Sequence, residues 1–130
     1  MKRIDFLRKL IGVASLLFIP VNLLKDKKRT WLLKFGVRGF QYYEGPALIN
    51  GLRPREQLSL VREPENKFDK YAIAIHYGGR KIGFVPAERN EVLSRLMDSG
   101  TVDLGAEILS INNDSNSWEG VSACIFLKQA

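Results

Sequence analysis

The side chains of this chain that could do chemistry gather in one short segment. Glu63, Asn66, Phe68 and Asp69 lie close together, and His76 follows within one further strand length. Carboxylates and an imidazole are the groups used for acid–base hydrolysis. However, Glu63 or Asp69 with His76 has no third partner at a recognisable spacing, and His76 lies among alternating apolar residues typical of a strand. We therefore expect no catalytic residues.

Cysteine and histidine are too scarce for most other reactive sites. Cys124 is the only cysteine and His76 the only histidine, so the chain can form neither an intrachain disulfide nor a zinc cage of Cys and His. A serine or cysteine nucleophile would also have to rely on His76. No glycine-rich loop followed by Lys-Ser or Lys-Thr is present to cradle a phosphate. The sequence predicts a non-catalytic protein without metal or cofactor.

Positive charge is concentrated at the start of the chain. The formal net charge is +6, and residues 1–30 account for all of it, with eight Lys or Arg against two Asp. Residues 31–130 hold 12 basic and 12 acidic residues, with the excess of basic residues before residue 90 and the excess of acidic residues after it. The basic character of the whole chain is therefore no argument that residues 31–130 bind phosphates.

Residues 1–30 form a leader with its own pattern. A charged start is followed by fifteen mostly apolar residues, Leu10 to Leu24, and then by a second basic cluster. This order is that of a secretory signal, although no small-x-small cleavage site follows. As a helix the apolar run would reach about 22 Å, short of a hydrocarbon core of about 30 Å. Two interpretations stay open: an uncleaved membrane anchor or degenerate signal, and an amphipathic helix on a membrane surface or on its own domain.

From Trp31 onward the pattern changes to short β-branched and aromatic runs separated by turn residues, which predicts a β-rich domain over residues 31–130. Gly78-Gly79 supplies the positive φ angles of a two-residue hairpin turn. The expected strands are Leu32–Phe40, Gln57–Arg62, Ala72–Tyr77, Lys81–Val85, Val102–Ile111 and Gly120–Leu127.

One segment carries a helical pattern instead. Pro86 suits a first turn, Gly100 suits the residue after a helix, and an apolar stripe between them is expected to face the core. The stripe consists of Val92, Leu93, Leu96 and Met97. A shorter helical turn is expected around Ala47–Asn50. The predicted fold class is all-β with one or two short helices, namely a six-stranded OB-like β-barrel, closed or nearly closed so that its edges are hidden, preceded by an N-terminal hydrophobic helix.

Two segments, Val37–Gly45 and Leu58–Ile75, are more specific than the rest of the chain, and Lys81–Pro86 follows them. The distinctive part is the run Arg-Glu-Pro-x-Asn-x-Phe-Asp-x-x-Ala-Ile from Arg62 to Ile73. From about Phe35 to Leu127 the sequence resembles the HIRAN domain family.

This resemblance implies an OB-like barrel that occurs fused to DNA-remodelling ATPases of the helicase-like transcription factor type and as short stand-alone bacterial proteins. In the fused members the domain captures the free 3′ end of single-stranded DNA. The resemblance thus implies single-stranded DNA ends as the ligand, a partner ATPase or helicase, and a role in DNA repair or replication-fork processing.

The resemblance also assigns residues by position. Tyr42 and Phe68 would stack under terminal bases, Asp69 would accept a hydrogen bond from the 3′ hydroxyl, and Asn66 would support the loop, with Tyr43 nearby. Stacking a base on an aromatic ring contributes about 1–3 kcal/mol and requires no particular sequence. The other predicted DNA contacts are Arg38, Gln41, Lys67 and Phe84.

Those residues also have a purely structural interpretation. Asn66 and Asp69 are common in tight turns because their side chains bond to nearby backbone amides. The sequence also departs from the DNA-binding members, with Gln41, Phe84 and Ala87 in place of an arginine, a histidine and a lysine. Each departure removes a phosphate contact and predicts weaker binding with a shallower salt dependence. The cations that could compensate are Arg38, Lys67, Lys70 and Arg89.

Two functional hypotheses follow. The first is a monomeric module that binds single-stranded DNA ends. The second is a membrane-tethered or exported module that holds a protein or another ligand on the same barrel, with membrane contact through residues 1–30. The leader favours a membrane-associated or exported location, whereas the first hypothesis requires the cytoplasm or an anchor whose domain faces it.

Overall fold

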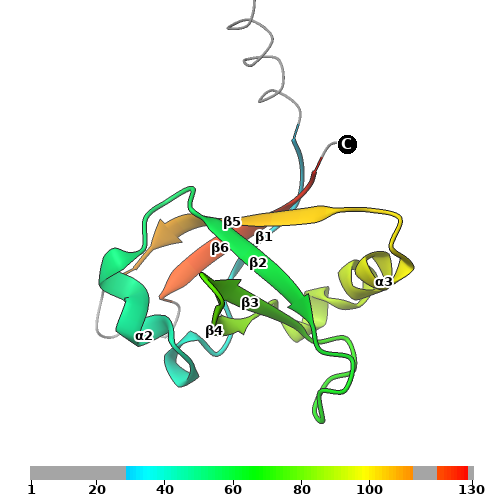
Figure 1. Ribbon diagram of the computed structural model, residues 1–130, viewed down its shortest axis with the longest axis horizontal. Helices are drawn as coiled ribbons and strands as arrows, with labels where there is room; N and C mark the ends of the chain where they lie inside the picture. Colours follow the sequence, from blue (N-terminus) through cyan, green and yellow to red (C-terminus); the bar gives the residue numbers. More distant parts are fainter. Residues whose placement is uncertain (1–28, 113–119, 129–130) are drawn as a thin grey trace, which may run out of the picture.

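The computed structural model describes residues 29–112 and 120–128, and its architecture is one antiparallel sheet with short helical segments (Figure 1). The predicted N-terminal helix lies outside these residues. Among the helices of the described part, none has the length and apolar character needed to cross a bilayer. The strands are β1 (Thr30–Gly36), β2 (Gln57–Arg62), β3 (Ile73–Tyr77), β4 (Arg80–Phe84), β5 (Leu104–Ile111) and β6 (Val121–Leu127).

The order of the strands in the sheet is β1-β6-β5-β2-β3-β4, and every neighbouring pair is antiparallel. The β3–β4 hairpin turns at Gly78 and Gly79, whose φ angles of 56° and 82° confirm the predicted two-residue turn. The sheet curls around one apolar core to which all six strands contribute, including Phe35, Ile75 and Ile125.

The prediction of a closed barrel is wrong, because the six strands form an open order in which β1 and β4 are the two edges. The segment after β1 nevertheless meets β4 at one isolated bridge. There the backbone N–H of Arg38 donates to the carbonyl of Phe84 and the N–H of Phe84 donates to the carbonyl of Arg38, each over 2.9 Å. This bridge, here called the seam, brings the two sheet edges together beside the site described below.

The first strand is shorter than predicted. It ends at Gly36, and Phe40, expected in the strand, lies buried in the helical turn η1 (Phe40–Tyr42). The cause is tertiary: Val37 still donates to the carbonyl of Val121 in β6, but Arg38 then bonds to Phe84 in the seam, so the chain turns from β6 to β4 after Val37. The turn expected around Ala47–Asn50 is present as α2 (Gly45–Leu48) and η2 (Ile49–Gly51).

The predicted helix after Pro86 forms in two pieces, η3 (Ala87–Arg89) and α3 (Glu91–Ser99), and α3 ends before Gly100 as expected. Leu93 is buried and Met97 packs against the core, but Val92 is 69% exposed, so its assignment to the core face is wrong. Asn90, between the two pieces, is 1% exposed. The helix α3 thus begins directly after a buried polar residue.

Candidate functional site

The loop between β2 and β3 is organised by Asn66. Its Oδ1 accepts hydrogen bonds from the backbone N–H groups of Phe68 and Asp69, at 2.9 and 3.1 Å. Its Nδ2 donates to Oε1 of Glu63 at 3.1 Å. An asparagine side chain that bonds to the amides two and three residues onward fixes the local turn. Asn66 therefore determines where Phe68 and Asp69 lie, as the structural interpretation of the sequence expects.

Asp69 joins this loop to the start of α3. Its Oδ1 accepts the backbone N–H of Tyr71 at 2.9 Å, and its Oδ2 accepts a hydrogen bond from Nδ2 of Asn90 at 2.7 Å. Each oxygen of an ionised carboxylate has about two acceptor positions, so both oxygens can still accept a further donor. The carboxylate is thus held in place and retains acceptor positions for a further hydrogen bond.

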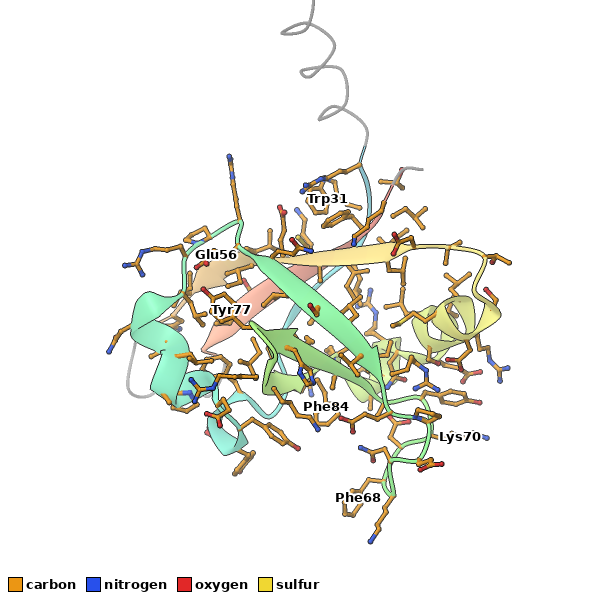
Figure 2. The ribbon with its side chains drawn as sticks, in the orientation of Figure 1. Trp31, Glu56, Phe68, Lys70, Tyr77 and Phe84 are labelled. Atoms are coloured by element: carbon orange, nitrogen blue, oxygen red, sulfur yellow. The ribbon has the colours of Figure 1, made fainter. Side chains whose placement is uncertain are left out.

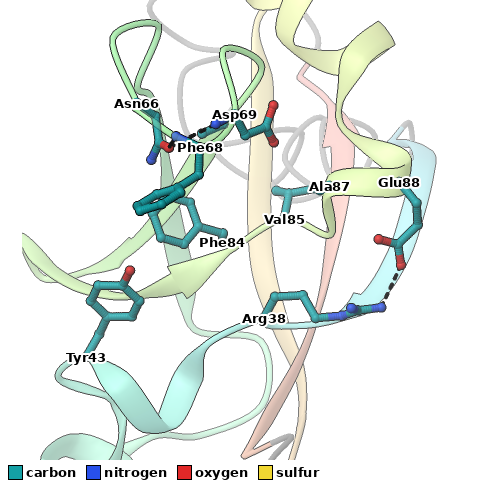
Figure 3. Close-up of a pocket in the computed structure, with 10 residues that line it drawn as sticks. Arg38, Tyr43, Asn66, Phe68, Asp69, Phe84, Val85, Ala87 and Glu88 are labelled. Carbon is teal, nitrogen blue, oxygen red and sulfur yellow. Dashed lines mark hydrogen bonds and ion pairs between the residues drawn. The ribbon is translucent and has the colours of Figure 1, made fainter.

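Beside this loop lies a pocket of about 300 Å³ (Figure 3). Its walls come from the β2–β3 loop, from β4 with the following turn η3, and from the segment around η1. The rings of Tyr43 and Phe84 meet edge to face, with centroids 5.5 Å apart and planes at 70°. The lining residues are Arg38, Tyr43, Asn66, Phe68, Asp69, Ala72, Phe84, Val85, Ala87 and Glu88.

Phe68 is the most exposed large apolar side chain of the described chain, at 97%. It lies at the far end of the projecting β2–β3 loop (Figure 2). A phenylalanine in this position gains almost nothing from burial in the free protein, while the loop hydrogen bonds fix its backbone. Both faces of the ring are open to a flat partner.

The structure separates the predicted site residues into two groups. Arg38, Tyr43, Asn66, Phe68, Asp69 and Phe84 line the pocket. Gln41, Tyr42 and Lys67 do not line it, and Tyr42 is 77% exposed. Of the two adjacent tyrosines, the structure thus brings Tyr43 rather than Tyr42 into the pocket.

The electrostatics of the pocket are set by one cation and two carboxylates. Arg38 Nη2 contacts Oε1 of Glu88 at 2.6 Å, and both side chains are more than half exposed. With Asp69, the lining residues carry a formal net charge of −1. The lining residues thus offer aromatic faces and acceptor oxygens, without an excess of positive charge of their own.

Behind the rings, Lys81 connects the pocket to the loop. Its Nζ lies 5.3 Å from the ring centroid of Tyr43 and 4.8 Å from that of Phe84, and it contacts Oε2 of Glu63 at 2.6 Å. Burial raises the pKa of Glu63. The hydrogen bonds from Lys81 and Asn66 and the electrostatic attraction of Lys81 and His76 lower it by more than burial raises it, so the pKa lies below the ordinary value of 4.5. Glu63 is therefore a stable anion that holds both Lys81 and Asn66.

A second hollow, of about 430 Å³, lies between β1 and α3 and is lined mainly by leucine and valine side chains. Glu88 borders both hollows. The second hollow has no aromatic ring and no amide side chain among its lining residues in the described chain. The first pocket is therefore the better candidate for recognising a defined ligand.

The site also contains residues that sequence reasoning missed. Glu63 was considered only as a candidate for acid–base hydrolysis, and Asn90 and Glu88 were not predicted as site residues. The spacing Glu63-x-x-Asn66 could have suggested the loop contact, because side chains three apart in a turn are neighbours. Nothing local marks Glu88 or Asn90, since their partners Arg38 and Asp69 lie 50 and 21 residues away.

The side chains that line the pocket supply groups suited to binding. The described residues include no group of three or more His, Cys, Asp or Glu that could hold a metal ion. Cys124 is buried away from the pocket, and burial raises the pKa of its thiol. What the pocket combines is stacking surface, hydrogen-bond acceptors and one paired guanidinium.

Comparison with known proteins is consistent with this architecture. Two solved structures are similar to the chain: a protein from Lactobacillus plantarum, with a TM-score of 0.66 and 22% identity over 77% of this chain and 95% of that one, and the HIRAN domain of human HLTF, with a TM-score of 0.59 and 21% identity over 80% and 83%. At such identities the likeness concerns the fold. No curated protein matches the sequence.

The sequence also matches a family model, that of the HIRAN domain, over residues 32–128. This range contains every strand residue from Leu32 to Leu127 and all residues that line the pocket. The resemblance that the Arg62–Ile73 run suggests thus extends over most of the chain, and the protein belongs to the HIRAN domain family.

Proposed function

We propose that this protein is a non-catalytic module that binds single-stranded DNA at a free 3′ end. The observation that carries the proposal is the meeting of an open ring, Phe68, and a fixed carboxylate, Asp69, in one pocket walled by Tyr43 and Phe84. A base can stack on an aromatic face whatever its sequence, and a carboxylate accepts a hydrogen bond from a hydroxyl. Membership of the HIRAN family supports the same ligand.

Each pocket residue has a proposed role that follows from the chemistry of its side chain. Phe68 stacks on a terminal base, with Tyr43 and Phe84 as the apolar wall against which the nucleotide rests. Asp69 accepts the hydrogen bond of the 3′ hydroxyl. Asn66 positions both loop residues, which its Oδ1 already holds. Tyr42, exposed outside the pocket, is available for the next base along the strand.

Affinity should be modest and weakly dependent on salt. Gln41, Phe84 and Ala87 stand where DNA-binding members have an arginine, a histidine and a lysine. The one cation among the lining residues is paired with Glu88. For a single strand the logarithm of the binding constant changes by about 0.7 per neutralised phosphate and per logarithmic unit of salt. We therefore expect the salt dependence of the binding constant to have a slope that corresponds to one or two phosphates. Any ATP-driven step would belong to a partner ATPase or helicase.

The test is a titration of the full chain with labelled oligonucleotides that end in a 3′ hydroxyl or a 3′ phosphate, at two salt concentrations, beside a circular single strand without ends. Preference for the free hydroxyl, lost in Asp69→Ala and Phe68→Ala, supports the proposal. Equal binding of the circle and the linear strand contradicts end recognition. Tyr42→Ala and Tyr43→Ala, measured side by side, decide which tyrosine contacts the strand.

A second candidate function is the capture of a protein or another non-nucleic ligand in the same pocket, by a module tethered through residues 1–30. The net charge of −1 among the lining residues favours it, because these residues supply no excess positive charge for a polyanion. Cell fractionation separates the two candidates, since a domain on the exported side of a membrane is separated from chromosomal DNA. Recovery with the chromosome in the cytoplasm contradicts the second candidate.

A further inference from the structure

An ion pair lies across one side of the pocket and joins two walls that are distant in sequence. Arg38, beside the seam, and Glu88, on η3, face each other with Nη2 and Oε1 at 2.6 Å (Figure 3). Arg38 is the one basic residue among those that line the pocket in the described chain. Any anionic group that approaches this guanidinium must do so beside the carboxylate of Glu88, which already accepts one of its N–H donors.

The positions of both partners are set by the fold. The backbone of Arg38 is bonded in both directions to Phe84. Glu88 lies on a short turn between two buried residues, Val85 and Asn90. The side chains themselves are 56% and 58% exposed, and an ion pair with this exposure adds little to stability. Its effect on what the pocket admits is therefore separable from its effect on folding.

The charges around this pair discriminate between two kinds of strand end. A terminal phosphate carries about −1.5 to −2 charges near neutral pH. In this pocket it would face the carboxylates of Asp69 and Glu88, with a guanidinium already neutralised by Glu88. A terminal hydroxyl has no charge to repel and finds acceptor oxygens instead.

We propose that Glu88 is a specificity-determining residue, which neutralises Arg38 and places a negative charge at the pocket so that phosphate-terminated strands are rejected. The inference rests on the proposed function and deepens it, because it names the group that excludes the wrong end. Asp69 supplies the acceptor for the correct end, whereas Glu88 acts against the incorrect one, and specificity commonly requires such a repulsive element.

The first test measures the discrimination ratio, which is the Kd for a 3′-phosphate oligonucleotide divided by the Kd for its 3′-hydroxyl counterpart. In Glu88→Gln we expect this ratio to fall about three- to tenfold, mainly through tighter binding of the phosphate end. Glu91→Gln is the matched control, because Glu91 forms an exposed pair with Arg95 at 3.2 Å and does not line this pocket. A ratio in Glu88→Gln equal to that of the unmodified protein overturns the inference.

The second test needs no DNA. Inorganic phosphate is titrated into the full chain while NMR follows the guanidinium signals of Arg38. We expect Glu88→Gln to bind phosphate several-fold more tightly than the unmodified protein or Glu91→Gln, and Arg38→Ala combined with Glu88→Gln to lose that gain. Equal phosphate binding in all variants overturns the role of Glu88. If no oligonucleotide binds but Glu88→Gln gains phosphate, the proposed function fails while the role of Glu88 stands.

Discussion

Asn90 donates a hydrogen bond from Nδ2 to Oδ2 of Asp69 over 2.7 Å, and this contact fixes the β2–β3 loop against the start of α3. Asn90 is 1% exposed, so its amide has little access to water as a substitute partner. We expect Asn90→Ala to lower the free energy of unfolding by about 1–3 kcal/mol, because a buried hydrogen bond and its packing are lost. Urea denaturation measures the change. Asn50→Ala, at an exposed position on η2, should change it by less than about 0.5 kcal/mol.

The contacts of Asn66 predict different effects for two substitutions. Asn66→Ala removes the acceptor for two backbone amides and the donor to Glu63, and should cost about 1–2 kcal/mol of stability. Asn66→Asp retains acceptor oxygens for the amides but places a second carboxylate beside Glu63. The destabilisation in Asn66→Asp should therefore shrink when the pH is lowered enough to protonate the two carboxylates. The destabilisation in Asn66→Ala should shrink less, only by the part that the hydrogen bond to ionised Glu63 contributes, because the loss of the two amide contacts does not depend on pH. Denaturation at two pH values compares them, and parallel behaviour would contradict the assigned contacts.

The carboxylate of Glu63 makes stability depend on pH. Burial raises its pKa, but Lys81 and Asn66 lower it further than burial raises it, so the folded value lies below the ordinary 4.5. A group whose pKa is depressed on folding contributes stability above its unfolded pKa and loses that contribution as the pH falls through the folded pKa. We expect the free energy of unfolding to decline below about pH 4.5, and less so in Glu63→Gln. The exposed Glu65→Gln is the control; if it flattens the profile as much, the assignment to Glu63 fails.

The seam should be sensitive to any side chain introduced at Gly83. Its φ is 151°, and a Cβ there would lie 2.4 Å from the backbone oxygen of Arg38 and 2.5 Å from Cγ1 of Val37. A backbone atom cannot move away as a flexible side chain can, so Gly83→Ala should cost about 2–4 kcal/mol and disturb the bridge. Gly51→Ala has open space around its Cβ and serves as the control. Similar denaturation midpoints for the two variants would show that the seam tolerates the methyl group.

Phe68 separates binding from stability. Because its side chain is 97% exposed, Phe68→Ala should leave the unfolding free energy within about 0.5 kcal/mol of the unmodified protein. Loss of a stacking surface should nevertheless weaken binding of a single-stranded oligonucleotide by about 1–3 kcal/mol. Fluorescence anisotropy measures the affinity, with Val92→Ala, an exposed apolar residue on α3, as the matched control. An unchanged Kd in Phe68→Ala would remove Phe68 from the site.

Much of the secondary structure follows from local sequence. The β2 strand was predicted at its observed bounds, and the β3–β4 hairpin follows from two glycines that turn without strain. The strand order could not be predicted in the same way. The pairing of β1 with β6 and of β2 with β5 joins segments far apart in the chain. An alternating apolar pattern indicates that a segment is a strand but does not indicate which other strand it pairs with.

For the site as well, local contacts could be predicted from the sequence and long-range contacts could not. Asn66, Phe68 and Asp69 form one local motif, so their proximity follows from the loop itself. Their relation to Arg38 and Glu88 depends on where the chain crosses from one sheet edge to the other, which is a property of the whole fold. The choice of Tyr43 over Tyr42 as pocket residue depends on the turn η1, in a segment that local propensity assigned partly to a strand.

The seam gives this pocket a property that its side chains alone would not. The backbone segments that carry Arg38 and Phe84 are joined by a pair of peptide hydrogen bonds, and these bonds use no side-chain atom of either residue. The distance between these two backbone segments is therefore set by the main chain. Side chains on the two segments can be exchanged while the bridge remains, so the chemistry that they present to a ligand can be changed one group at a time.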